Sequence, residues 1–170
     1  MSNPQCYVVD TNTIIDLHCG KLLQKIFHLP CTFIITDFII HELRELPFQE
    51  LSSRGLHGES LNPDEIIQIT EMMERYEKPS YEDLSVLILA KSKKTILITG
   101  DEALRHAAIA NEVECRGTCW LIDYLANRSI ISFSEAIEAY ERIQRKPRYP
   151  PRDECRSLRS QWVKKQKMLE

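Results

Sequence analysis

Glycine is scarce in this sequence of 170 residues, with five in all and none between Met1 and Cys19. Dinucleotide-binding folds and P-loops need a glycine-rich turn directly after a strand, because only glycine lets the backbone approach phosphate so closely. The chain lacks the turn that either class requires. It also lacks the G-x-S-x-G turn that presents the serine nucleophile of many hydrolases.

The cysteines and histidines are not spaced for a zinc site. The six cysteines form no C-x-x-C pair, and the single C-x-x-x-C, from Cys115 to Cys119, has no second cluster of Cys or His to complete it. The five histidines show no H-x-x-x-H spacing. We therefore expect all six cysteines to be reduced and to serve as small apolar side chains.

Long apolar runs are missing as well. A membrane-spanning helix needs about 20 apolar residues, whereas the best run here, Leu84 to Ala90, is short and contains Ser85. Asp10 and Asp16 interrupt the only apolar stretch near the start, which argues against a secretory signal. The sequence predicts no membrane insertion and a cytoplasmic location.

Charge is distributed unevenly along the chain, although the formal net charge is only −3. Residues 142–170 carry ten basic and three acidic side chains, which leaves 12 basic and 22 acidic ones in residues 1–141. Prolines at 147, 150 and 151 separate the two parts. We predict a domain over residues 1–146 and a basic, helical extension over residues 147–170.

The basic extension has two competing interpretations. Its positive charge is suited to neutralising the phosphates of a nucleic acid, which supply most of the affinity of such complexes. Alternatively, the extension folds back onto the acidic body or forms a dimer contact through Leu158 and Trp162, which are among its few apolar anchors. The sequence favours neither.

Short β-branched runs alternate with helical patterns, which is typical of a parallel sheet covered by helices on both faces. Continuous apolar runs predict strands at 6–9, 32–35 and 95–98, because strands buried on both faces show no alternation. The segment 52–60 is either a loop or an extra short strand. Helices are expected at 13–26, 37–45, 64–76, 81–91, 102–110, 120–126, 133–144 and 152–169.

Four acidic residues lie where such a sheet binds its ligands, beyond the carboxyl ends of the strands. Asp10 follows the first predicted strand and Asp101 follows the third. Glu42 lies in the helix after the second strand, and Asp83 lies in the first turn of the helix that leads into the third. Each of Glu42, Asp83 and Asp101 also has a structural explanation as a helix cap or a solvated helix residue; Asp10 is the hardest to explain so.

Four converging carboxylates repel one another unless cations are present. Mg²⁺ or Mn²⁺ prefers hard oxygen ligands and takes one or two carboxylates each. Such a site suits phosphodiester hydrolysis, because one ion activates a water and a second stabilises the departing oxygen.

Residues 7–12, 35–43, 80–85 and 98–105 together resemble a PIN domain, and more narrowly the VapC-like ribonuclease toxins of type II toxin–antitoxin modules. The resemblance implies a three-layer α/β/α sandwich with a parallel sheet of about five strands and an acidic pocket that binds Mg²⁺ or Mn²⁺. It assigns Asp10, Glu42, Asp83 and Asp101 as metal ligands and Asn12 as a polar partner. It also implies a homodimer and an antitoxin partner. It extends over residues 113–125, which include Asp123, a residue that it does not assign to the site.

We therefore predict a metal-dependent endoribonuclease that hydrolyses RNA phosphodiester bonds, either as a toxin of a toxin–antitoxin module or in RNA processing or quality control without an antitoxin. The alternative is a PIN-like module that binds RNA or protein with weak or no nuclease activity. The presence of all four acids favours the enzyme.

Overall fold

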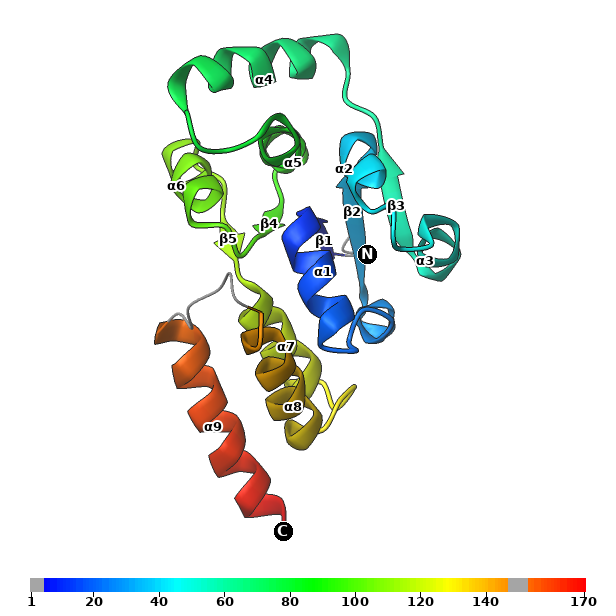
Figure 1. Ribbon diagram of the computed structural model, residues 1–170, viewed down its shortest axis with the longest axis vertical. Helices are drawn as coiled ribbons and strands as arrows, with labels where there is room; N and C mark the ends of the chain where they lie inside the picture. Colours follow the sequence, from blue (N-terminus) through cyan, green and yellow to red (C-terminus); the bar gives the residue numbers. More distant parts are fainter. Residues whose placement is uncertain (1–4, 147–152) are drawn as a thin grey trace.

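A parallel sheet forms the centre of the molecule in the computed structural model, which describes residues 5–146 and 153–170 (Figure 1). Within these residues five strands lie in the order β3-β2-β1-β4-β5, and every neighbouring pair is parallel. Helices flank the sheet, so the predicted α/β/α sandwich is confirmed. The strands are β1 (Gln5–Val9), β2 (Cys31–Thr36), β3 (Leu56–Glu59), β4 (Ile96–Ile98) and β5 (Cys115–Arg116).

The three strands predicted from continuous apolar runs are the central ones. Val8, Phe33 and Leu97 are fully buried in them, as expected for strands covered on both faces. β3 forms within the segment that the sequence left open between a loop and a strand. β5 was not predicted, because two residues are too few to make an apolar run.

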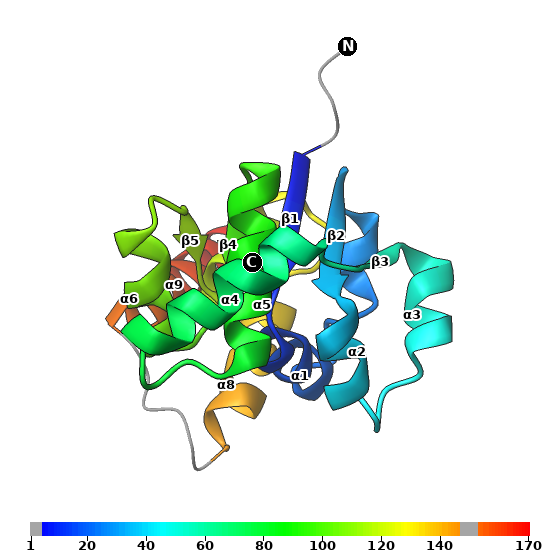
Figure 2. The ribbon, with the colours of Figure 1, turned by 90° about the horizontal axis from the view of Figure 1, so that it is seen from above.

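One face of the sheet is covered by α5 (Tyr81–Lys93) and α6 (Glu102–Ala110), and α4 (Pro63–Arg75) packs against α5. All seven residues from Leu84 to Ala90 are buried, because α5 packs against β1, β2 and β4 on one side while α4 contacts it as well (Figure 2). The apolar run that was too short to cross a membrane is therefore the central helix of this layer. No helix of the described residues is long and apolar enough to span a membrane.

The helices that follow β1 and β5 pack on one another as a second group, which includes α1 (Thr11–Cys19), α7 (Thr118–Asn127) and α8 (Phe133–Gln144). α1 ends well before residue 26, because Gly20 caps it and Lys21 adopts a positive φ of 60°. A short 3₁₀ helix (Lys25–His28) follows it. After β2 come α2 (Asp37–Glu42) and α3 (Phe48–Arg54), and α2 ends three residues earlier than predicted, where the backbone turns at the buried Leu43.

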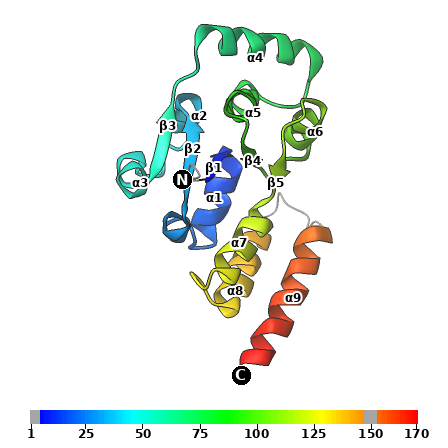
Figure 3. The same cartoon turned by 180° about the vertical axis from the view of Figure 1, so that it is seen from behind.

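The basic extension folds back onto the domain as α9 (Asp153–Leu169), which lies along α7 and α8 (Figures 1 and 3). Trp162 is fully buried, packs edge-on against Tyr140 at 6.3 Å between ring centroids, and donates Nε1–H to Asp123 Oδ1 at 2.8 Å. The face of the extension that carries Trp162 therefore folds back onto the body, as the second of the two interpretations proposed. The helix break predicted at prolines 147, 150 and 151 lies outside the described residues, and the division into two parts stays a prediction.

One prediction about the cysteines is wrong. Cys119, in the first turn of α7, and Cys155, in the first turn of α9, form a disulfide with Cα atoms 5.5 Å apart. Their separation of 36 residues hides this pairing from the sequence, because only the docking of α9 brings them together. The four remaining cysteines are free and half-buried.

Candidate active site

The four predicted acids lie at the edge of the sheet where the parallel strands end. Asp10 directly follows β1, and Asp101 follows β4 after Thr99 and Gly100. Glu42 is the last residue of α2, the helix that follows β2, and Asp83 lies in the first turn of α5. We call Asp10, Glu42, Asp83 and Asp101 the acidic edge.

Asp10 is the most enclosed of the four acids, with 1% of its surface exposed. Its Oδ1 accepts the backbone N–H of Thr13 at 2.7 Å, which caps α1, and its Oδ2 accepts the hydroxyl of Thr99 at 2.5 Å. Burial raises the pKa of Asp10 to about 6, although both hydrogen bonds favour the ionised form. Both carboxylate oxygens of Asp10 thus accept hydrogen bonds, and neither forms an ion pair among the described residues.

Thr99 connects Asp10 to Asp101. Its hydroxyl donates to Asp10 and accepts the backbone N–H of Asp101 at 3.0 Å. Asp101 Oδ1 accepts the backbone N–H of Leu104 at 2.7 Å, so Asp101 caps α6 as the structural explanation anticipated. Asp101 therefore caps α6 and also belongs to the acidic edge, because the cap bond uses only one of its two carboxylate oxygens.

Asp83 interacts electrostatically with both of the other aspartates, Asp10 and Asp101. It forms a capping box with Ser80, in which each side chain accepts the other residue's backbone N–H, at 2.9 and 3.0 Å. Burial raises the pKa of Asp83, and the negative charge of Asp101 raises it further. Asp83 in turn raises the pKa of Asp10. The three carboxylates are therefore close enough to repel one another.

Glu42 joins the same group through a hydroxyl. Its Oε2 accepts the hydroxyl of Thr11, the residue that follows Asp10, although Glu42 itself is exposed. Asn12 is half-buried, and its side chain forms no hydrogen bond with the four carboxylates in the described part of the chain. The structure thus brings Glu42 to the N-terminus of α1, while the role predicted for Asn12 stays a prediction.

None of the four acids forms an ion pair with a lysine or arginine among the described residues. Their negative charge is opposed by hydroxyls, by backbone N–H groups and by the positive ends of α1, α5 and α6. Carboxylate oxygens are the donors that Mg²⁺ and Mn²⁺ prefer, so the donor set fits these ions. In residues 5–146 and 153–170, however, no three His, Cys, Asp or Glu side chains already form a metal-binding group.

The sequence did not assign a role to Thr11 or Thr99, which hold Glu42 and Asp10. Thr99 directly follows β4 and precedes Asp101 by two positions, and Thr11 directly follows Asp10 at the end of β1. A hydroxyl beside an acid at a strand end is the signal that could have identified them. Asp123, which was not assigned to the site, lies under α9, where its two oxygens accept hydrogen bonds from Trp162 and Asn127.

Two features define the class of this protein. The fold is an α/β/α sandwich, and acids that form no ion pair among the described residues lie at the carboxyl ends of its parallel strands. The family model of the PIN domain DUF3368 matches residues 6–164. The chain belongs to this family. PIN domains are typically nucleases and generally use divalent metal ions.

Among solved structures, the chain is similar to a PilT N-terminus domain protein from the hyperthermophilic archaeon Sulfolobus solfataricus P2. The two share 14% sequence identity over 75% of this chain and 95% of the other, with a TM-score of 0.45. A search of the curated proteins gave no match.

Proposed function

We propose that this PIN domain is a metal-dependent endoribonuclease that hydrolyses RNA phosphodiester bonds with Mg²⁺ or Mn²⁺. The observation that supports the proposal is the acidic edge: four carboxylates lie at one end of the sheet, and none of them forms an ion pair with a lysine or arginine among the described residues. A merely structural set of acids is expected to be ion-paired or dispersed, because unpaired buried charge is costly.

Asp10, Asp83 and Asp101, together with Glu42, are the residues that would hold the divalent ions. A bound divalent cation lowers the pKa of a water and neutralises charge that develops on the phosphate. Thr13 and Thr99 fix the orientation of the Asp10 carboxylate, and Thr11 fixes that of Glu42. Asn12 is proposed as a polar partner of the reacting groups, from its position two residues after Asp10.

Cleavage of a mixed RNA substrate by the purified chain tests this proposal. We expect cleavage with Mg²⁺ or Mn²⁺, none with EDTA, and a loss of more than about 100-fold in Asp10→Asn, because even residues that only support metal ligands commonly contribute 10- to 100-fold. Asparagine keeps the size of the side chain and an oxygen that can accept the N–H of Thr13, so α1 stays capped.

Asp64→Asn is the matched control, since Asp64 is an exposed acid in the first turn of α4 and lies outside the acidic edge. It should cleave like the wild type. If the wild type leaves all RNA intact with both metals, or if Asp10→Asn cleaves as well as Asp64→Asn, the enzyme proposal is wrong and the binding module takes its place.

The toxin role, the antitoxin partner and the homodimer are further parts of the proposal, supported by the similarity of the four motif segments to VapC-like toxins. Expression of the wild type should arrest growth, whereas expression of Asp10→Asn should not. Growth restored by co-expression of a small neighbouring gene identifies the antitoxin. Unimpaired growth on expression of a wild type that cleaves RNA in vitro contradicts the toxin role.

A further inference from the structure

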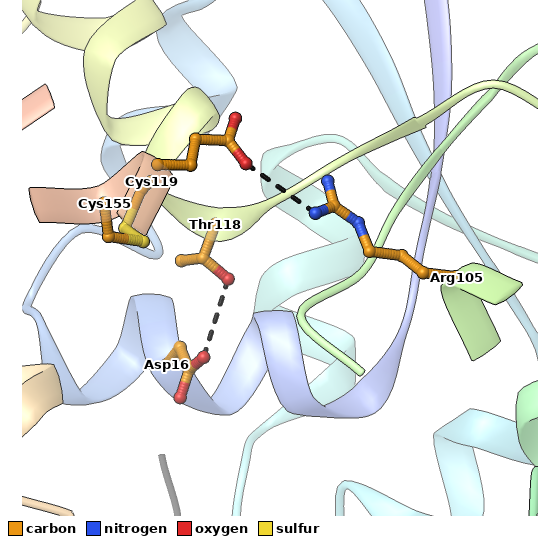
Figure 4. The surroundings of a disulfide bond; sticks show 6 residues. Asp16, Arg105, Thr118, Cys119 and Cys155 are labelled. Carbon is orange, nitrogen blue, oxygen red and sulfur yellow. Dashed lines mark hydrogen bonds and ion pairs between the residues drawn. A yellow bond between two sulfur atoms is a disulfide. The ribbon is translucent and has the colours of Figure 1, made fainter. Parts of the chain in front are cut away.

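A small cavity of about 50 Å³ lies directly beside the acidic edge, between the loop that carries Asp101 and the amino end of α9. Gly100 lines it from the side of the acidic edge, and Glu154 and Cys155 line it from the side of α9. Figure 4 shows Arg105, Thr118 and the disulfide around this space. Gly100 precedes Asp101 in the chain, so the cavity and the acidic edge are adjacent along this loop.

Arg105 is the only basic residue among the described residues that line this cavity. It lies one helical turn after Asp101 in α6, and 22% of its side chain is exposed. Its guanidinium reaches across to the end of β5, where its Nη2 lies 3.9 Å from the position that a Cβ on Gly117 would occupy. A positive charge thus lies one turn of α6 away from Asp101, although Arg105 forms no ion pair with the acidic edge among the described residues.

The partner of Arg105 is Glu154 of α9, with Nη1 and Oε2 separated by 3.6 Å. Glu154 is adjacent to Cys155, whose disulfide with Cys119 ties the first turn of α9 to the first turn of α7. A guanidinium binds carboxylate and phosphate with the same planar set of donors. The Glu154 carboxylate is therefore paired with a guanidinium that is equally suited to bind phosphate.

We propose that Arg105 binds a phosphate of the RNA substrate beside the acidic edge, and that Glu154, held in place by the Cys119–Cys155 disulfide, competes for it until the disulfide is reduced. The inference rests on the proposed ribonuclease function and adds a substrate-binding residue and its control. In the reduction, a dithiol donates two electrons and two protons. The Cys119–Cys155 bond breaks, both cysteines become thiols, and the dithiol becomes a disulfide.

The rest of α9 has its own attachments, so reduction frees only its first turn. Trp162 is buried against Tyr140 and bonded to Asp123, and Arg159 pairs with Glu141 at 2.9 Å. In the first turn, by contrast, Asp153 and Glu154 are exposed. We therefore expect a local change at Arg105 and not the release of the whole helix.

RNA affinity measured by fluorescence anisotropy tests the inference, with a labelled single-stranded RNA in EDTA so that no substrate is cleaved. The oxidised and dithiothreitol-reduced wild-type proteins are compared, and alkylation with mass spectrometry verifies the state of Cys119 and Cys155. Reduction should tighten binding by about 3- to 10-fold, because a competing carboxylate is removed from one phosphate contact.

Three variants separate the parts of the mechanism. Glu154→Gln should bind tightly in both redox states, because it keeps the disulfide but loses the competing charge. Cys155→Ser should match the reduced wild type under oxidising conditions. Arg105→Gln should bind weakly in both states, with no response to reduction. Cys19→Ser, which removes a free cysteine in α1, is the matched control and should respond like the wild type.

Equal RNA affinity of the oxidised wild type, the reduced wild type and Glu154→Gln overturns the inference, as does a wild type whose Cys119 and Cys155 are both alkylated under oxidising conditions. Circular dichroism establishes that each variant is folded. Cleavage with Mg²⁺ in both redox states separates the two proposals. RNA cleavage without any effect of Glu154→Gln or reduction contradicts only this inference, whereas redox-dependent RNA binding without cleavage contradicts only the ribonuclease function.

Discussion

Two buried aspartates, Asp10 at the N-cap of α1 and Asp16 within that helix, have opposite surroundings. Asp16 is 5% exposed and forms an ion pair with Lys146 at 3.2 Å. Asp10 is 1% exposed and accepts hydrogen bonds from Thr13 and Thr99, and it forms no ion pair among the described residues. Burial raises the pKa of both carboxyls, but at Asp16 the Lys146 charge opposes that effect. Lys146 thus compensates the buried charge of Asp16, while none of the described lysines and arginines does so for Asp10.

The same contrast holds between two larger regions. In the group formed by α7, α8 and α9, acids such as Glu138 and Glu141 pair with arginines. At the acidic edge, no such pair forms within the described residues. Sites where charge is left uncompensated inside an otherwise consistent structure are usually functional. The comparison therefore distinguishes a region whose acids are paired with arginines from the acidic edge, which we propose binds a ligand.

Trp162→Ala should produce the largest change, and it should be a change in stability alone. Replacing a fully buried tryptophan by alanine typically lowers the free energy of unfolding by about 3–5 kcal/mol, and here it also leaves Asp123 without its Nε1–H donor. Urea denaturation measures the loss. The affinity of the acidic edge for Mn²⁺ should not change.

Trp162→Phe is the control for this prediction. It keeps an aromatic ring against Tyr140 and loses only the hydrogen bond to Asp123, so it should cost about 1 kcal/mol. A Trp162→Ala protein as stable as the wild type would contradict the view that α9 is an integral part of the fold.

The second prediction concerns Asp10 and pH. In EDTA, the folded protein keeps a proton on Asp10 up to pH of about 6, while the unfolded chain releases it near 3.8. Unfolding therefore becomes easier as the pH rises through this window. Asp10→Asn removes the penalty and should be more stable than the wild type by up to about 3 kcal/mol at pH 7.

Thermal denaturation of both proteins at pH 3.5 and pH 7 measures this difference. At pH 3.5 the two should be nearly equal, because Asp10 is protonated in both the folded and the unfolded wild type. A wild type that is more stable than Asp10→Asn at pH 7 without metal would show that the buried charge is compensated after all.

Lys146→Gln should have a smaller effect. It leaves the Asp16 carboxylate buried without its ion-pair partner, and since Lys146 is itself 25% exposed, we expect a loss of about 2 kcal/mol at pH 7. Urea denaturation measures it. The double variant Lys146→Gln with Asp16→Asn should recover part of the loss, and no loss in the single variant would remove the contrast between the two aspartates.

The sequence predicted the central strands and the four acids because those features are local. β1 and β4 are unbroken apolar runs, and Asp10 and Asp101 lie directly after or close to their ends. In a parallel sheet these ends share one edge, so topology alone was enough to bring the acids together.

The features that the sequence did not predict depend on tertiary contacts. The hydroxyl of Thr99 bonds to Asp10 across 89 positions of the chain, and no local pattern records that partner. The disulfide requires α9 to dock before Cys155 can meet Cys119. β5 is held in the sheet only by its pairing with β4, since its two residues have no strand pattern of their own.

Titration of Mn²⁺ into the wild type by isothermal calorimetry at pH 7 tests the central claim most directly, because it asks whether the uncompensated carboxylates bind a divalent cation. We predict binding by the wild type and by Asp64→Asn, with binding abolished in Asp10→Asn and weakened in Asp101→Asn. Equal Mn²⁺ affinity in the wild type and Asp10→Asn, or no binding by a folded wild type, would contradict the assignment of the acidic edge as a metal site.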